Sequence, residues 1–468
     1  MAQSRLEELP IKVQQTITSM LPDLESIRSI ALASPSWYRA FANSELLITS
    51  QILEDEVDFD VLPEATAALD SSRISPWTQQ QIQEFVSQHL HSRRIPPQKW
   101  TLPDALLLSN LHDHVYCFTM DFVSKALGKS PCPTDLEPDQ PELSQNEMAR
   151  IIRAFYRFEI YCNIFRNPHR TLFSVEQQRS IFFSNFSLWE NEQLACIHDY
   201  LVRVVSPAFN DIAEHDVAWG KFSVEYGDKI DSRFIQHLLS LGLEDLHQIA
   251  LAEDYEERRE LIYYRYPPRN AQFLYTGLKM ANEPDDGAFL SDYTQDEELA
   301  HIKDPFAQDS DTGPSDAWRW AHKGETCSNF VNSDSRQLLR EWGYVMWDHA
   351  RLDNWGIFEM PWEAPDTSAR ADAEREHVAK MQASFDRRSE IFKARGRGWW
   401  SFENEGGVIW PRETRDTRRW PPIWRPRQVN SLNEARTFLT SLASGSEDPA
   451  FHRRHQQRSR FWGFSLRN

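Results

Sequence analysis

Histidine is followed directly by aspartate at three places, and such neighbours are candidates for general acid–base catalysis or zinc binding. The three places are residues 112–114, 198–199 and 215–216. Because residues two apart on a helix point to different faces, His112 and His114 cannot ligate one ion from a single helix. The chain also has no HExxH motif. We therefore interpret these histidines as core or surface residues and predict neither a catalytic residue nor a metal site.

The densest polar and aromatic cluster is WDHARLDNWGIFEMPWE at residues 347–363. Asp348 and Arg351 lie one helical turn apart, which predicts an i, i+3 ion pair between them. Trp347 and Trp355 are interpreted as core residues. If this region has a ligand, the cluster would line its pocket. An enzyme with an unrecognised site is one alternative for the function of the chain, and it predicts a deep pocket that holds several titratable residues.

The five cysteines form no CxxC pair, which argues against a zinc ribbon and against a disulfide framework. Cys162 and Cys196 fall on apolar helix stripes, so we expect buried, inert thiols. The sequence contains no GxSxG, GxGxxG or GxxxxGK motif, and we expect no cofactor. Because the N-terminus lacks a secretory signal and no run of about 18 apolar residues occurs, we expect a cytoplasmic or nuclear protein without a membrane partner.

Helical periodicity dominates the chain, and strand alternation is almost absent. Apolar residues recur at helical spacing in 79–90, 146–165, 188–205, 232–242 and 335–347. Ser187 and Glu190 form a capping box, and Gly242 stands where a C-cap would be expected. The prediction is an all-α fold: a short N-terminal three-helix motif followed by a large irregular helical domain.

Composition divides the chain into four parts. These are a motif at 5–50, a helical body at 51–281, an acidic linker or loop at 282–316, and a Trp/Arg-rich helical region at 317–468 with an irregular basic tail. Within the last part, 364–395 reads as a charged helix that projects from the body, followed by an irregular loop. Residues 366–468 carry 20 Lys and Arg against 13 Asp and Glu, a net charge of +7 that leaves −26 for residues 1–365. Such an acidic body should repel nucleic acid.

Three prolines divide residues 9–41 into three short helices. Pro10 suits a first turn, Pro22 ends the helix that it opens, Asp23 caps the second helix, and Ser34 caps a third with Pro35 at its first position. Helices this short are marginal in isolation, where even alanine-rich ones need about 12–15 residues. They must pack on each other and on something else.

These residues resemble the F-box. Leu9 and Pro10 match the family's LP opening, and a closing aromatic residue is matched by Trp37. The resemblance implies binding to the Skp-type adaptor of SCF ubiquitin ligases, with the cullin as a further partner. It assigns adaptor contacts to a set of apolar positions along the motif: Leu9, Pro10, Val13, Ile17, Leu21, Leu32 and Trp37.

The body resembles that of filamentous-fungal proteins with an F-box-like head and a long helical body. The similar segments include RAFYRFEIYCNIFR and WENEQLACIHDYL, and the resemblance covers the chain to about residue 360. The resemblance of the body implies fold and organisation alone, whereas the F-box resemblance implies the substrate-recognition subunit of an SCF-type ligase, which performs no bond chemistry itself and binds an unknown target protein. The alternatives are a scaffold outside any ligase, with its N-terminal patch covered by the body, and the enzyme considered above.

Tryptophan is concentrated near the C-terminus, where 12 of the 17 lie at or after residue 318. Exposed Trp and Arg are favoured interface anchors, so we predict target contacts there, and a Trp-rich core is the competing interpretation. The predicted target-binding residues are Trp399, Trp400, Trp420 and Trp424.

Overall fold

The computed structural model describes residues 6–91, 99–129, 142–166, 172–227, 229–263, 273–279, 281, 309–323, 337–359, 361–363 and 368–411. The chain divides into two compact units, Met1–Pro411 and Arg412–Asn468. All described residues belong to the first unit. The predictions for residues 282–308 and for the basic tail fall on residues outside the described ranges.

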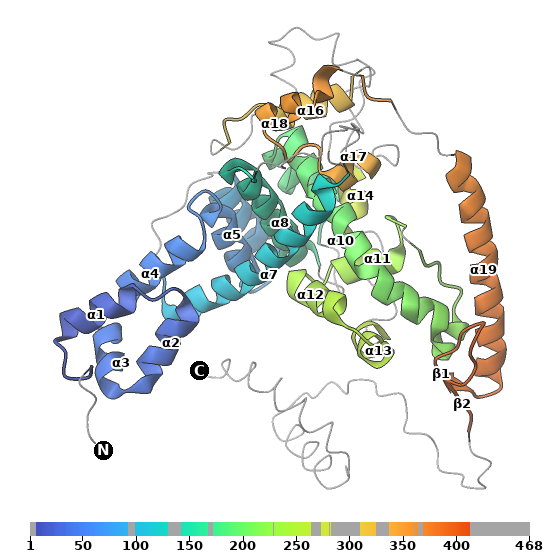
Figure 1. Cartoon of the computed structure of the whole chain (residues 1–468), viewed down its shortest axis with the longest axis horizontal. Helices are drawn as coiled ribbons and strands as arrows, with labels where there is room; N and C mark the ends of the chain where they lie inside the picture. The colour runs from blue at the N-terminus through green and yellow to red at the C-terminus, as the bar shows by residue number, and fades with distance from the viewer. Residues whose placement is uncertain are drawn as a thin grey trace. The chain divides into compact units, whose positions relative to one another are not determined.

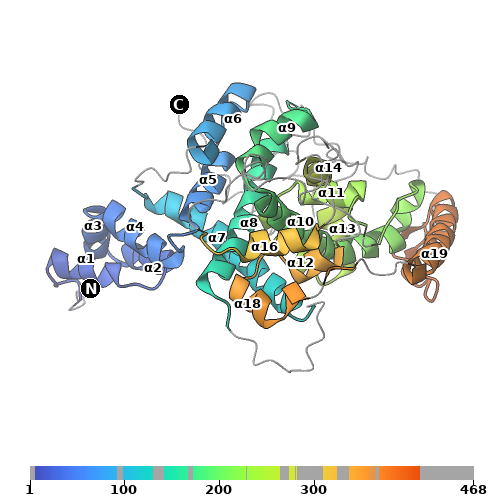
Figure 2. The same cartoon turned by 90° about the horizontal axis from the view of Figure 1, so that it is seen from above.

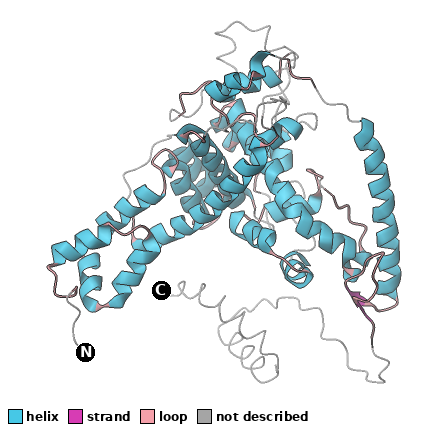
Figure 3. Ribbon diagram, viewed as in Figure 1, coloured by secondary structure: helices cyan, strands magenta, loops and turns pink. Residues whose placement is uncertain are grey.

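The described residues are all-α, as predicted: 18 α-helices and one two-stranded sheet (Figure 3). The helices at the N-terminal end are α1 (Ile11–Ser19), α2 (Leu24–Ala33), α3 (Pro35–Ala42) and α4 (Glu45–Glu56). The capping predictions are confirmed, because Asp23 accepts a hydrogen bond from the amide of Ser26, and Ser34 accepts one from the amide of Trp37. We call residues 6–56 the head.

The head joins the body through one side only. α2 and α4 pack against α7 (Leu102–Leu127), a long helix of the body, as Figures 1 and 2 show. Leu24, Ile27 and Phe41 are buried in the same hydrophobic core as the body. α1 instead packs on α3 and α4, and therefore on other parts of the head.

The body is built around α8 (Gln145–Phe165) and α10 (Leu188–His215), which are buried along most of their length. The predicted capping box is present at Ser187 and Glu190. Gly242 was expected to be a C-cap and is instead the N-cap of α12, with a φ of 95°. The C-cap of the preceding helix, α11, is Ser240. The other body elements are α5 (Leu62–Ser72), α6 (Gln79–Phe85), the π-helix η1 (Val86–His91), α9 (Val175–Ile181), η2 (Phe183–Asn185), η3 (Val217–Lys221), α11 (Arg233–Leu239), α12 (Leu243–Leu251), α13 (Tyr255–Tyr263), α14 (Phe273–Lys279), α16 (Gly313–Ala321), α17 (Gln337–Trp342), α18 (His349–Asn354) and η6 (Ile357–Glu359).

The charged segment at 364–395 forms the helix α19 (Ser368–Lys393), but the expectation that it projects from the body is wrong. Its C-terminal half packs on η3 and α10, and Ser384, Arg388 and Ile391 are buried there. Close approach is possible because residue 220 is glycine, where a Cβ atom would lie 2.5 Å from the backbone carbon of Arg388. A contact between two backbones needs few apolar side chains. The charged composition of residues 364–395 therefore gave no sign that α19 packs on the body.

The segment after α19 was expected to be an irregular loop and instead contains a small hairpin. β1 (Arg397–Gly398) pairs antiparallel with β2 (Val408–Ile409), with Arg397 opposite Ile409. A bridge between Asp216 and Trp399 attaches the hairpin to the body.

The end of the predicted acidic linker is likewise part of the body. Asp309 and Asp311 bind Arg150 of α8, and α16 begins at Gly313. Buried cationic partners, which the local sequence cannot reveal, explain why these acidic residues are not solvated.

Candidate functional site

Helix α1 is inverted with respect to an ordinary surface helix, because its buried residues are polar. Gln14 and Thr18 are fully buried, whereas Ile11, Val13 and Met20 are 51, 42 and 79% exposed. A surface helix normally turns its apolar stripe inward. The exposed apolar side of α1 is therefore available to a partner.

Hydrogen bonds explain why Gln14 is buried. Its Nε2 donates to the carbonyl oxygens of Leu6 and Glu7 and to Oγ of Ser36, the last at 3.0 Å. The Ser36 hydroxyl is also 3.2 Å from the carbonyl oxygen of Glu7, to which it donates. This network fixes residues 6–9 and α3 to α1, and satisfies the polar groups that burial would otherwise penalise.

The head carries far more exposed apolar side chains than its length would suggest. Of the 18 large hydrophobic residues that are exposed in the described part of the chain, 8 lie in the head. They are Leu6, Ile11, Val13, Met20, Leu32, Tyr38, Leu46 and Leu47. Single exposed apolar residues are ordinary, but this concentration is typical of a protein-binding surface.

The predicted adaptor contacts fall into three classes of exposure. Pro10, Val13 and Leu32 are exposed, and Leu9, Ile17 and Leu21 are half-buried. Trp37, expected as an exposed anchor, is only 6% exposed. It is buried on the inner side of α3 together with Ala40 and Phe41, where α3 packs on α1 and α2. Trp37 therefore supports the head from within and does not present its ring to a partner.

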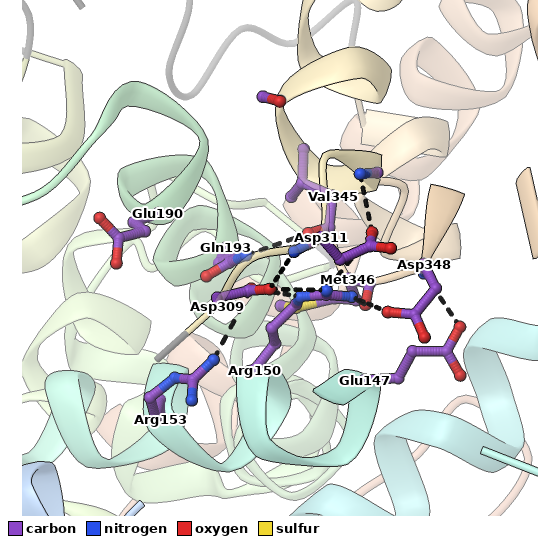
Figure 4. A network of polar contacts seen from close by, with 12 residues as sticks. Glu147, Arg150, Arg153, Glu190, Gln193, Asp309, Asp311, Val345, Met346 and Asp348 are labelled. Carbon is purple, nitrogen blue, oxygen red and sulfur yellow. Dashed lines mark hydrogen bonds and ion pairs between the residues drawn. The ribbon is translucent and has the colours of Figure 1, made fainter. Parts of the chain in front are cut away.

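A buried ionic cluster lies in the body at the polar sequence around residue 348 (Figure 4). The Arg150 guanidinium binds both oxygens of Asp309, at 2.5 and 2.9 Å, and Oδ1 of Asp348 at 2.6 Å. Its Nη1 also donates to the carbonyl oxygen of Met346. The arginine thus joins three segments that are far apart in the sequence.

The predicted pair between Asp348 and Arg351 is wrong. Arg351 instead binds both carboxylate oxygens of Glu147, each at 2.6 Å, while Asp348 binds Arg150. Asp348 is the N-cap residue of α18, but its side chain turns away from that helix to Arg150, so both predicted partners bind charged residues of α8 instead of each other. Trp347 is buried, as predicted, and Trp355 is half-buried against the core.

The arginines of this cluster favour the ionised forms of the carboxyl groups of Glu147 and Asp309. Burial alone would raise the pKa of Glu147, but hydrogen bonds from Arg351 and from the amides of Asp348 and Ser144 hold that pKa below its usual value. Burial also opposes ionisation of Asp309, and Arg150 outweighs it, so the pKa of Asp309 is lowered. Paired charges of this kind leave little capacity for general acid or base chemistry near neutral pH.

A second buried cluster is similarly paired. Arg340 binds Glu192 at 2.8 Å and Asp199 at 3.4 Å. His198 is buried between Asp199, at 2.8 Å, and the amide of Gln236, at 2.7 Å. The opposite charges of this cluster are paired with each other, which is the pattern of a structural network.

Three further candidates for chemistry, Cys162, Cys196 and His112, are core residues. Burial raises the pKa of the Cys162 and Cys196 thiols well above the usual value, which makes both poor nucleophiles. His112 is buried against the hydroxyl of Tyr156 at 2.7 Å. Within the described ranges, no group of three or more His, Cys, Asp or Glu side chains is arranged to hold a metal ion. No helix there is long and apolar enough to cross a membrane.

The predicted target-binding tryptophans are only partly placed. Trp399 is half-buried with its ring 4.9 Å from that of His215. Trp400 is 2% exposed and donates its indole N–H to Glu405, so the expectation of an exposed contact is wrong for this residue. Trp420 and Trp424 lie outside the described residues. No known family model, curated protein or solved structure matches the chain.

Two functional features were not predicted from the sequence. The inverted orientation of α1 depends on the contacts of Gln14 with Ser36, 22 residues away. The exposure of Phe402, Ile409 and Trp410 near the hairpin was also not predicted. The local signal for the first feature is that the polar Gln14 directly follows the apolar Val13.

Proposed function

We propose that this chain is the substrate-recognition subunit of an SCF-type ubiquitin ligase, which binds a Skp-type adaptor through the head and an unidentified target protein through the body. The head would recruit the adaptor and its cullin. The chain itself would make and break no bond. It would raise the local concentration of the target at the ligase.

The inverted helix α1 is the observation that carries this proposal. A helix that buries Gln14 and Thr18 and exposes Val13, with Met20 exposed at its C-cap, has an apolar side that no described part of the chain covers. α2 and α4 meet the body, whereas α1 packs on other helices of the head. The scaffold alternative expects the body to cover the N-terminal apolar residues, and the exposure of Val13 and Leu32 argues against it.

The test is co-purification of the full chain from eukaryotic cells, with adaptor and cullin detected by mass spectrometry. The test variant is Val13→Asp combined with Leu32→Asp, because both side chains are exposed and the changes should leave the head folded. A variant of Trp37 would be uninformative, since loss of a buried aromatic residue costs about 3–5 kcal/mol and would unfold the head.

The matched control is Leu107→Asp combined with Leu251→Asp, which places the same charges on exposed leucines of α7 and α12. The proposal expects adaptor and cullin with the wild type and the control, and neither with the head variant. Absence of both from the wild-type sample would sink the ligase assignment and favour a scaffold.

A further inference from the structure

We propose that a basic surface at the C-terminal end of α19 binds an acidic, leucine-containing segment of a partner protein. The surface consists of Lys221 of η3, Lys393 of α19, Arg395 of the following turn and Arg397 of β1. We call it the α19 basic surface. It would serve target recognition in the proposed receptor, but it stands independently of adaptor binding.

The ring of Phe392 connects two of these cations. The ammonium group of Lys221 lies 4.6 Å from the ring centroid of Phe392, and the guanidinium of Arg397 lies 4.2 Å from the same centroid. Cations over a ring are held by its quadrupole, so two cations from different elements are fixed around one phenylalanine. Lys393 follows Phe392 directly in α19.

The four cations of this surface have no acidic partner among the described residues. None of the four forms an ion pair with an acidic side chain among the described residues, whereas nearby Arg387 binds both Glu390 and Glu405. Lys221, Lys393 and Arg395 are exposed. Residues 1–365 carry a net charge of −26 and residues 366–468 one of +7, and three of the four cations belong to the positive part.

Capping of α19 does not account for the whole cluster. Cations stabilise the negative end of a helix dipole, and Arg397 donates to the carbonyl oxygens of Phe392 and Gly396. Lys221 comes from a different element, however, and Lys393 is exposed with no hydrogen bond to the last turn. Several full positive charges also outweigh the half negative charge of a helix end, roughly −0.5.

Apolar side chains adjoin the charges. Ile409 is opposite Arg397 in the two-stranded sheet, so the two side chains share one face of it, and Ile409 is 67% exposed. Trp410 and Phe402, at 51 and 59% exposed, extend from the same hairpin. A ligand that carries both acidic and aliphatic side chains would match both kinds of group.

The surface is pre-formed. Gly220 admits the backbone of α19 to η3, and Arg388 donates to the carbonyl oxygen of Asp216. Trp400 is buried in the hairpin and donates to Glu405, which Arg387 holds in turn. Such a rigid support reduces the ordering cost of binding.

An acidic peptide fits this surface better than a nucleic acid does. Nucleic-acid affinity depends on neutralising many phosphates, and a long polyanion would meet the acidic body next to four cations. A short acidic segment can pair with these cations while its aliphatic residues contact Ile409. Charge complementarity and exposed apolar side chains therefore select the same class of partner.

The test is fluorescence anisotropy with the full chain and a labelled peptide in which glutamate alternates with leucine. The proposal expects binding that weakens as salt is added, because the charged groups attract the peptide. A Lys221→Glu, Lys393→Glu double variant should weaken binding by at least about tenfold. Ile409→Ser should weaken binding of this peptide but not of one in which serine replaces the leucines.

The matched control is the Lys279→Glu, Lys323→Glu double variant, which makes the same change in net charge on exposed residues at the end of α14 and just after α16. It should bind like the wild type, and thermal unfolding should show that both double variants are folded. The proposal is overturned if the wild type does not bind the peptide, if both double variants bind equally, or if a single-stranded oligonucleotide is bound in preference. Adaptor co-purification should be unaffected by either double variant, so the two proposals fail separately.

Discussion

Nε of Arg351 donates to Oε1 of Glu147 at 2.6 Å across 204 positions of sequence. The same carboxylate accepts the amide of Ser144 and so closes the N-terminus of α8, and it also accepts the amide of Asp348. One buried side chain thus caps a central helix and fixes the segment that leads into α18. This contact ties residues 337–359 to the body.

Replacing Glu147 with Gln should destabilise the protein most at neutral pH. The pKa of Glu147 is lower in the folded state than its ordinary 4.5, so its contribution is complete above about pH 4.5 and is lost as the pH falls through the folded value. Breaking a buried pair costs about 3–5 kcal/mol. Urea unfolding should therefore show a large deficit at neutral pH that shrinks in acid.

The exposed residue Glu54 offers a control, and Glu54→Gln should change stability little at any pH. A deficit for the Glu147 variant that stays constant into strong acid would mean that the ionised carboxylate is not what stabilises the contact.

Gly220→Ala should loosen α19. The new methyl group would lie 2.5–2.7 Å from backbone atoms of Arg388 and Ser389, which cannot rotate away as a side chain can. Overpacking of this kind costs about 1–3 kcal/mol. Hydrogen exchange should become faster in α19 near Arg388.

Gly128→Ala is the matched comparison, because a Cβ atom at Gly128 meets nothing within 4 Å. That variant should be neutral or slightly stabilising. Equal exchange rates in α19 for the wild type and Gly220→Ala would show that this helix does not depend on the close approach.

Gln14→Ala should destabilise the head without affecting the body. The change removes the donor shared by the carbonyl oxygens of Leu6 and Glu7, and leaving such groups unsatisfied costs about 1–3 kcal/mol. Limited proteolysis should cut the variant faster within residues 6–42 than the wild type. Thr16→Ala, at an exposed position of the same helix, should not change the cleavage rate there, and identical digestion of all three proteins would remove Gln14 from the account.

Local signals predicted the head helices well and their orientation poorly. Asp23 and Ser34 cap helices as expected, because capping depends on residues within one turn. The orientation of α1 depends on Ser36, and the burial of Trp37 depends on packing between helices. Neither is encoded in the periodicity of α1 or α3 alone.

The same distinction explains the errors in the body. Asp309 belongs to a segment predicted to be an acidic linker, and Asp348 was predicted to pair with Arg351, yet both bind Arg150 of the buried helix α8. The approach of α19 depends on a single glycine in another element. Contacts between residues 150 or more positions apart therefore decided what local patterns left open.

Calorimetric titration of the purified adaptor into the full chain is the sharpest test of the proposal that the apolar side of α1 binds a Skp-type adaptor. We expect saturable binding to the wild type, at least about tenfold weaker binding to Val13→Asp, and unchanged binding to Leu107→Asp. Absence of binding to the wild type, or equal affinity for all three proteins, would contradict the proposal.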